Sequence, residues 1–496
     1  MKQEVTETPV KGVIIGAGPA GLSAAYELMR HGFSSVVLEK GMQAGGLSRT
    51  VEYRGFLFDI GGHRFFTKVA VVKRMWREIL GNDMLVRPRL SRIYYGGVFY
   101  SYPLEPLETV FKLGIFESTL SLLSYIKAQL FPAKDERDLE GWLINRFGRR
   151  LYRRFFKTYT EKVWGMKCTE IGAEWAAQRI RGLSIPALIW SVLAKMIPGA
   201  KGTGLKTLID SFEYPRLGPG MMWEKAAEMV GGVEYNADVT AIEWGGGKVN
   251  AVVAGGKTWR GEHFISSMPM RTLVERLEPA GPEYLNAVQK LRYRDFLTVA
   301  LILKVANPFP DNWIYVHDEG VKVGRIQNFR NWSPEMVPNE TSTCLGMEYF
   351  VFEGDALWSM PDKELISLAM AEVVKLGLAK ERDFEDGCVI REPKAYPIYD
   401  NNYAVAVDAV KRFLREEASN LQCVGRNGMH RYNNQDHSML TGVLASRNIM
   451  ELGKHDLWHV NADEHYHEDG FHLSQEEIDS MEAMQPSTPE KVNASL

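Results

Sequence analysis

The sequence lacks the features that mark several large classes of protein. Its 496 residues carry 59 basic and 62 acidic side chains, a formal net charge of -3, so there is no excess of positive charge for binding nucleic acid. Only four cysteines are present, and no two have the C-x-x-C spacing of a metal site or redox pair. We therefore expect reduced thiols, no bound metal and no nucleic-acid partner.

Long uninterrupted apolar runs are also missing. Two apolar stretches, residues 110–130 and 185–197, are broken by lysine or glutamate, whereas a membrane-spanning helix needs about 20 apolar residues in succession. The first eleven residues are polar and lack the apolar core of a signal peptide. We expect no transmembrane segment, a cytoplasmic location, and two amphipathic helices that pack in the core or between lobes. Peripheral contact with a membrane is the alternative.

The strongest local pattern is a complete βαβ unit near the N-terminus. Apolar residues 13–15 lead into Gly16-Ala17-Gly18-Pro19-Ala20-Gly21, a helical stretch follows, and residues 36–38 form a second apolar strand. In this G-x-G-x-x-G pattern the first glycine permits a tight turn, the second lets a pyrophosphate approach, and the third lets helix and strand pack closely. The helix N-terminus adds free N–H groups. The unit predicts a dinucleotide site.

An acidic residue and further glycines narrow the choice of dinucleotide. Glu39 ends the second strand, where a carboxylate binds the adenosine ribose and disfavours a 2′-phosphate, which argues against NADP. The following Gly45-Gly46-Leu47-Ser48-Arg49 resembles the FAD fingerprint of amine oxidase and glutathione reductase-like flavoproteins. Gly425-Arg426-Asn427-Gly428, with a helix expected over 438–450, is similar to their second FAD segment. We therefore expect FAD as the cofactor.

This resemblance implies which residues surround the cofactor. The expected FAD contacts are Gly16, Gly18, Ala20, Gly21, Glu39, Lys40, Gly46, Leu47, Ser48, Gly62, His63, Gly425, Arg426, Asn434, Gln435 and Ser438.

The remaining patterns divide the chain into lobes, because one hydrophobic core stops growing at roughly 250–300 residues. Residues 103–204 read as largely helical, 233–267 as short β-like runs, and 295–305 and 343–352 as strands of a second sheet. The expected class is α/β: a Rossmann-type FAD-binding domain with an inserted helical lobe and a second mixed β-sheet substrate domain. The expected parts are 1–100, 206–275 and 411–462 for the FAD-binding domain, 101–205 for the helical lobe, 276–410 for the substrate-binding sheet and 463–496 for a polar tail.

Five further stretches resemble the UDP-galactopyranose mutases, in the order in which that family has them. They are Gly61-Gly62-His63-Arg64-Phe65-Phe66-Thr67; Trp164 with Trp175 and Arg179; Trp313-Ile314-Tyr315 with Arg325 and Asn331-Trp332-Ser333-Pro334; Tyr396-Pro397; and Tyr432 with Asn434-Gln435-Asp436-His437-Ser438. The resemblance implies a nucleotide-sugar mutase of polysaccharide biosynthesis that interconverts pyranose and furanose forms through a reduced-flavin N5 adduct. It also implies that reduced FAD is the active form and that a cellular reductant such as NAD(P)H supplies the electrons.

The same resemblance implies roles for single residues. His63, Arg179 and Arg325 would be catalytic, because two planar guanidinium groups suit the oxygens of a substrate diphosphate. Taken singly, each residue has a plainer interpretation as a salt-bridge partner, a structural histidine or a core aromatic, and only the collective match favours function. The expected substrate-binding residues are Trp164, Tyr315, Tyr396, Tyr432 and Asn434.

Two other functions share much of this pattern. A FAD-dependent oxidoreductase of the amine oxidase or protoporphyrinogen oxidase type would pass electrons from an amine or C–H donor to oxygen or a quinone. A non-catalytic FAD-bearing scaffold would leave the pocket arginines and aromatics without a use. The oligomeric state stays open. A basic group is expected to form a solvated helix face, with contact to anionic lipid or to a partner as the alternative; it comprises Arg149, Arg150, Arg153 and Arg154.

Overall fold

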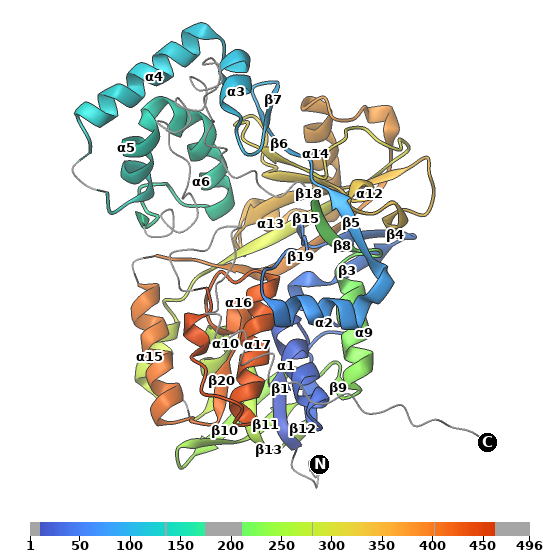
Figure 1. The fold of residues 1–496 in the computed structure, drawn as a ribbon, viewed down its shortest axis with the longest axis vertical. Coiled ribbons are helices and arrows are strands. Elements are labelled where there is room, and N and C mark those ends of the chain that lie inside the picture. The colour runs from blue at the N-terminus through green and yellow to red at the C-terminus, as the bar shows by residue number, and fades with distance from the viewer. Residues whose placement is uncertain (1–9, 134–135, 174–210, 280, 401, 462–496) are drawn as a thin grey trace, which may run out of the picture.

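The structure is a computed structural model that describes residues 10–133, 136–173, 211–279, 281–400 and 402–461. Figure 1 shows a lower part built on one sheet, an upper part built on another, and a group of helices at the upper left. Several sequence-based predictions lie outside the described residues, namely those for Trp175, Arg179, the stretch 185–197 and the tail 463–496.

The lower part contains a five-stranded sheet in which all neighbouring strands are parallel. In spatial order its strands are β20 (Leu421–Cys423), β13 (Gly261–Ser266), β1 (Val10–Ile15), β2 (Ser35–Leu38) and β9 (Val233–Glu234). Parallel strands are covered on both faces, which is why apolar residues dominate β1 and β2. Helix α1 (Pro19–Arg30) lies between α17 (Gln435–Ile449) and α9 (Gly220–Val230) and packs on this sheet.

A smaller four-stranded sheet adjoins the parallel one and shares its hydrophobic core. Its antiparallel strands β10, β11 and β12, together with β9 and β13 of the parallel sheet, account for the β-like runs expected over 233–267. The four strands in spatial order are β12 (Lys257–Trp259), β11 (Lys248–Ala254), β10 (Val239–Gly245) and β14 (Leu277–Glu278).

The upper part is a seven-stranded mixed sheet. In spatial order it consists of β19 (Phe384–Pro397), β15 (Tyr293–Leu303), β18 (Thr343–Val351), β17 (Arg325–Asn328), β16 (Trp313–Val316), β6 (Ser91–Tyr95) and β7 (Val98–Ser101). All neighbours are antiparallel except β16 and β6. Helix α14 (Asp362–Lys375) packs on β15 and β19. The strands expected over 295–305 and 343–352 are confirmed as β15 and β18.

The helices at the upper left form the inserted lobe (Figure 1). Leu143, Phe147 and Trp164 belong to its own small core, and Tyr396 and Tyr432 from the rest of the molecule pack against that core. The lobe therefore borders the space between the two sheets. Its elements are α3 (Pro106–Leu113), α4 (Ile115–Leu130), α5 (Leu139–Leu151), a π-helical turn (Tyr152–Lys157) and α6 (Thr158–Trp164).

One prediction about this lobe is wrong. The apolar residues of the stretch 110–130 were expected to pack in the core or between lobes, but many of them, including Phe116 and Leu123, are exposed in the described structure. The reason is that α4 turns its polar side toward α5: Ser121 is buried there, and Gln129 donates a hydrogen bond to the Asn145 carbonyl at 2.5 Å.

The expected α/β class, with a Rossmann-type sheet, a helical lobe and a second mixed sheet, is confirmed. The stretch 1–100 contributes to both large sheets, since β6 and β7 pair beside β16. The remaining named elements are β3 (Thr50–Tyr53) with β4 (Phe56–Asp59), β5 (Met84–Pro88) with β8 (Ser211–Pro215), α2 (Ala70–Leu80), α10 (Met270–Glu275), α11 (Pro282–Val288), α12 (Phe329–Trp332), α13 (Ala356–Ser359), α15 (Tyr403–Glu416) and α16 (Gly425–Gly428).

Across the five described ranges, no helix is long and apolar enough to cross a membrane. Nor do His, Cys, Asp and Glu side chains there form a group of three or more that could hold a metal ion. All four cysteines are free thiols.

Candidate active site

The glycine turn between β1 and α1 is shaped partly by the protein's own packing. Gly16 has φ +99°, and a Cβ there would lie 2.3 Å from the Ser267 Oγ. A Cβ at Gly21 would lie 1.9 Å from the Gly16 carbonyl oxygen. Both positions therefore require glycine whether or not a ligand is bound.

Gly18 is different, because nothing in the protein requires it to be glycine. Its φ of -81° is open to any residue, and an added Cβ would meet only the Gly46 Cα, at 3.9 Å. Gly18 is also the N-cap of α1, where no side chain caps the first N–H groups. Open space above uncapped N–H groups fits the pyrophosphate of a dinucleotide.

The acid at the end of β2 reaches this turn. The two Glu39 carboxylate oxygens accept hydrogen bonds from the backbone N–H groups of Ala17 and Gly41, both at 2.8 Å. These bonds hold the carboxylate at the glycine turn and leave it further acceptor capacity for ribose hydroxyls. Lys40, also an expected FAD contact, is exposed beside it.

The second glycine pair lies directly on the first turn. The Gly45 N–H donates to the Ala17 carbonyl at 2.8 Å, and a Cβ at Gly46 would lie 3.2 Å from the Gly18 Cα. Ser48 is buried at the end of the same turn. The expected extension of the fingerprint thus forms one continuous cradle with the G-x-G-x-x-G turn.

The C-terminal segment returns to the start of α1. A Cβ at Gly425 would lie 2.9 Å from the Ala20 Cβ, which places the 425–428 turn against the N-terminal fingerprint. Asn434 is the N-cap of α17, and Ser438 is buried in the first turn of that helix. Both polar side-chain atoms of Gln435 are buried without a hydrogen-bond partner among the described residues. An orphaned amide beside the glycine cradle fits a bound cofactor, so the chain's residues fit FAD.

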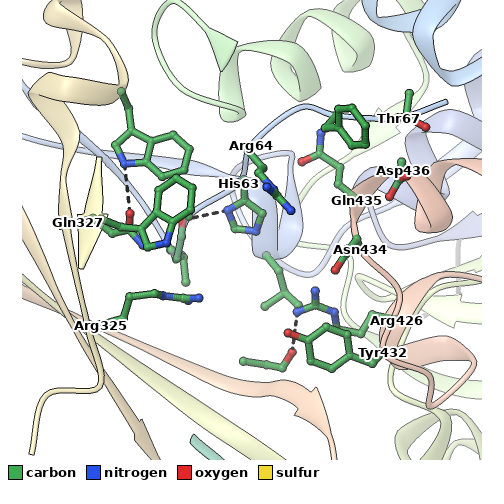
Figure 2. Close-up of a pocket in the computed structure, with 18 of the residues that line it drawn as sticks. His63, Arg64, Thr67, Arg325, Gln327, Arg426, Tyr432, Asn434, Gln435 and Asp436 are labelled. Carbon is green, nitrogen blue, oxygen red and sulfur yellow. Dashed lines mark hydrogen bonds between the residues drawn. The ribbon is translucent and has the colours of Figure 1, made fainter. Parts of the chain in front are cut away.

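A cavity of about 300 Å³ opens between the two large sheets (Figure 2). Most of its wall comes from three regions distant in sequence, the 60–69 loop, strands β16 and β17, and the segment 426–436, and the rest from single residues such as Arg89 and Tyr396. The sequence-predicted residues that line it are Leu47, Gly62, His63, Tyr315, Arg325, Tyr396, Arg426, Tyr432, Asn434 and Gln435. The structure therefore brings four of the five expected substrate-binding residues into one cavity with six of the expected FAD contacts.

One expected substrate-binding residue, Trp164, does not line the cavity. Trp164 is buried at the end of α6, with its ring 6.2 Å from that of Tyr432, so it supports the wall from behind. Arg179 lies outside the described residues.

His63 sits at the centre of the cavity wall with its ring orientation set by the backbone (Figure 2). Its Nδ1 lies 3.0 Å from the Gly61 carbonyl oxygen, so Nδ1 carries the proton and donates it there. Burial, followed by the positive charges of Arg426 and Arg325, lowers the pKa of His63 from 6.5 to about 3. The imidazole is neutral at physiological pH.

Arg325 is held from behind by a buried acid. Its Nε donates to the Glu348 carboxylate, whose other oxygen accepts from the Gln327 amide at 2.9 Å. Burial works against the charged guanidinium, but the Glu348 carboxylate, together with the neighbouring tyrosine hydroxyls, outweighs burial and keeps the pKa of Arg325 well above its ordinary value. A Cβ built on Gly61 would lie 3.7 Å from the Arg325 Nη2, so this edge of the guanidinium faces the loop that leads to His63.

Aromatic rings form the wall nearest the helical lobe. The Tyr396 and Tyr432 rings stack with centroids 5.5 Å apart and an angle of 22° between their planes. The Arg426 guanidinium carbon lies 5.0 Å and 4.9 Å from their centroids, within cation–π range. Tyr315, on β16, also lines the cavity, and its ring centroid lies 5.5 Å from that of Tyr159 in the helical lobe.

Sequence reasoning missed several residues of this cavity. Arg89 lines it, with its guanidinium carbon 5.6 Å from the Trp313 ring and 5.7 Å from the Tyr102 ring. The basic run 87–92 could have suggested Arg89, but nothing local in the sequence points to Glu348. With Arg89 included, the charged lining residues are five cations and one acid: Arg64, Lys68, Arg89, Arg325, Arg426 and Asp436.

Comparison with known proteins places this site among flavoproteins. The family described as flavin containing amine oxidoreductase matches residues 19–449. A crystal structure of reduced UDP-galactopyranose mutase has a TM-score of 0.79 and 21% identity, covering 94% of this chain and all of that one. Cyclohexylamine oxidase from Brevibacterium oxydans IH-35A has a TM-score of 0.62 and 16% identity, covering 90% of this chain and 99% of that one. At these identities the solved structures show a shared fold.

The sequence matches to curated proteins are local. An L-amino acid oxidase from Crotalus durissus cumanensis is 40% identical over 118 residues, which is 21% of this chain and 24% of the oxidase. The chain thus matches about a quarter of the length of that relative. The resemblance predicted from the sequence, to the superfamily of amine oxidase and mutase-like flavoproteins, is confirmed.

Proposed function

This chain belongs to the family of flavin containing amine oxidoreductases, and within that family we propose that it is a FAD-dependent nucleotide-sugar mutase. It would interconvert the pyranose and furanose forms of a sugar nucleotide. Reduced FAD, when bound, supplies a nucleophilic nitrogen to this chemistry. The glycine cradle around Gly18 and Gly46, with Glu39 beside it, would hold the cofactor. A cellular reductant such as NAD(P)H and a cytoplasmic location belong to the same proposal.

The observation that carries this proposal is the strong positive charge of the cavity. Five cations and one acid line it, and Arg325 presents its Nη edge toward the loop at Gly61. A sugar nucleotide carries a diphosphate, whose oxygens suit guanidinium forks, and a cation beside the leaving group stabilises the charge that develops there. Arg325 and Arg89 are the described residues best placed for this, with Arg179 as the further arginine implied by the mutase resemblance.

The other lining residues would position the sugar. The stacked rings of Tyr396 and Tyr432 offer a flat wall for the apolar face of a hexose, while hydroxyl and amide groups near them can bind its polar edge. Neutral His63 keeps an unprotonated Nε2 that can accept a hydrogen bond. We assign His63 no role as a proton donor, because its pKa of about 3 leaves it unprotonated on that atom at neutral pH.

A FAD-dependent oxidoreductase is the second candidate, and a specific finding favours it. The curated relatives of this chain include L-amino acid oxidases, and an amino-acid carboxylate would also suit Arg325 or Arg89. In that case electrons would leave the substrate, and the positive cavity would bind a single carboxylate in place of a diphosphate.

One anaerobic experiment separates the two candidates. The purified flavoprotein is incubated with UDP-, GDP- and dTDP-hexoses, with and without dithionite, and the products are chromatographed. The mutase proposal predicts an isomeric product only in reduced samples, with no net oxidation of the flavin. A parallel set contains oxidised protein and L-amino acids or amines. Bleaching of the flavin by one of these donors, with no isomeric product from any sugar nucleotide, would contradict the mutase and support the oxidase.

A further inference from the structure

The exposed apolar side chains of this protein are concentrated in one stretch. Among the described residues, twenty large apolar side chains are exposed, and ten of them lie between 107 and 131, on α3, α4 and the adjoining turns. The most exposed are Ile115 at 86%, Phe111 at 82% and Phe116 at 76%. Soluble monomers rarely present a contiguous apolar surface of this kind, and those that do use it for binding.

Helix α4 has the reverse of the usual orientation for a surface helix. Ile115, Leu123 and Leu130 on its outer side are exposed, whereas Ser121 on its inner side is buried. The Ser124 Oγ accepts a hydrogen bond from a backbone N–H of α5 at 3.2 Å. An amphipathic helix on a soluble protein buries its apolar side and exposes its polar side. The outward apolar side of α4 is therefore suited to a partner.

Positive charge borders this apolar edge. Residues 106–157 contain ten Lys and Arg against six Asp and Glu, although the whole chain has a net charge of -3. Lys127, Arg149 and Arg153 are exposed and form no ion pair with another described residue. Arg149 lies close to α4, because a Cβ on the neighbouring Gly148 would be 2.7 Å from the Tyr125 backbone nitrogen. The partner is thus expected to be negatively charged.

The position of α3 and α4 suits a flat partner. Figure 1 shows both helices at the outer edge of the lobe, on the side away from the parallel sheet. A protruding edge can meet a planar surface without steric hindrance from the rest of the molecule. Helix α4 has 16 residues and is about 24 Å long, so it can lie along a bilayer interface but is too short to cross the hydrocarbon core.

We propose that the edge formed by α3 and α4 binds the surface of a membrane containing anionic phospholipids, with the apolar side of α4 in the interface and the basic residues over the headgroups. Hydrocarbon accepts the bulky Ile, Leu and Phe side chains, and anionic headgroups attract the cations. A second copy of the chain suits the edge less well, because a two-fold contact would bring two positively charged surfaces together. This inference does not depend on which reaction the cavity performs.

Vesicle flotation with the full-length flavoprotein tests the proposal. We expect binding to vesicles of phosphatidylcholine with about 30 mol % phosphatidylserine, much weaker binding to phosphatidylcholine alone, and a decrease as salt is raised. The double variant Ile115→Ser with Phe116→Ser should lower the bound fraction at least about tenfold, because two of the most exposed apolar side chains are lost. Lys127→Glu with Arg149→Glu should weaken binding to the anionic vesicles selectively.

The matched control is Val405→Ser, which removes an apolar side chain that is 69% exposed on α15. It should bind vesicles like the wild type, and flavin absorbance and thermal unfolding should confirm that all variants remain folded. The proposal is overturned if the wild-type protein does not float with anionic vesicles. A second outcome would also overturn it. If light scattering shows that the wild type is a dimer, and the double variant Ile115→Ser with Phe116→Ser is monomeric but binds vesicles as before, the edge joins two copies of the chain.

Discussion

Arg325 on β17 lies directly opposite Glu348 on β18, and its Nε donates a hydrogen bond to the buried Glu348 carboxylate. Because the acid holds the guanidinium from behind, the Nη edge stays directed at the loop around Gly61. The pair explains how a cation can be fixed at the junction of the two sheets while one side remains available to an anion.

Replacing Arg325 should weaken the binding of a nucleoside diphosphate. We expect Arg325→Ala to raise the Kd for UDP or GDP by roughly 10- to 100-fold, the usual range for a lost charge-assisted hydrogen bond. Arg325→Lys should give an intermediate loss of affinity. Because lysine keeps a positive charge beside Glu348, this variant controls for misfolding caused by an unpaired buried acid. Titration calorimetry measures both. Arg382→Ala, at an arginine whose side chain is 78% exposed, should not change the Kd. Equal affinity in all four proteins would remove Arg325 from the anion site.

Two glycines of the same turn should respond differently to alanine. Gly18→Ala leaves the protein's own packing intact, so the variant should fold yet lose most of its bound flavin, because the added methyl group fills the space of the pyrophosphate. Gly21→Ala places a Cβ 1.9 Å from the Gly16 carbonyl oxygen, so it should lower the stability of the apoprotein itself. Flavin absorbance after purification and thermal unfolding of the apoproteins distinguish these outcomes. A Gly18→Ala variant with full flavin content would contradict the assigned cradle.

Acid should destabilise the protein through His317. Burial lowers the pKa of this histidine from 6.5 to about 3, so between these values the unfolded chain binds the proton more readily than the folded one. Its contribution to stability is complete above pH 6.5 and is lost as the pH falls. Between pH 7 and pH 5 the loss at this one group is about 2 kcal/mol.

The variant that tests this is His317→Phe. In the wild type the His317 ring stacks on the Tyr159 ring with centroids 4.7 Å apart, and phenylalanine keeps an aromatic ring in that place. Urea unfolding at both pH values should show a smaller acid-induced loss in this variant. His459→Phe, at a histidine that is 79% exposed, should lose as much stability as the wild type. The same acid-induced loss in all three proteins would show that His317 is not the group responsible.

Arg294 should be important for joining the helical lobe to the second sheet. It is buried on β15 and donates to the Val163 and Lys162 carbonyls at the end of α6 and to the Phe350 carbonyl on β18. Arg294→Met should lower the free energy of unfolding by about 3 kcal/mol, because buried carbonyls lose their donors. Denaturant unfolding measures this, with Arg382→Met as control. A loss below about 0.5 kcal/mol, the usual effect of a surface substitution, would show that the junction does not depend on Arg294.

The N-terminal nucleotide-binding unit could be predicted in detail from the sequence. Its strand, glycine turn, helix and acid follow one another within about 30 residues, and their geometry depends on local backbone conformation and short-range packing. The structure places Gly16, Gly21 and Glu39 as the pattern predicts. The second sheet could be predicted only as separate strands, because strand order depends on contacts between residues far apart in the sequence.

The cavity was predictable in part. Resemblance to a family located His63, Arg325, Tyr396 and Tyr432, which the fold does bring together. It missed Glu348, because an acid 23 residues from Arg325 becomes its partner only through the pairing of β17 with β18. Arg89 was missed for a different reason: it belongs to a basic run that matches no recognised motif, and only the fold brings it to the cavity.

By itself, the sequence determined the glycine cradle, the secondary structure of the long periodic segments and the amphipathic character of residues 110–130. Only the tertiary structure decided which side of α4 faces outward, which acid holds Arg325, and which cations share one cavity. The physical reason is that periodicity and turn chemistry act between neighbouring residues, whereas burial and charge pairing depend on segments that meet only when the chain has folded.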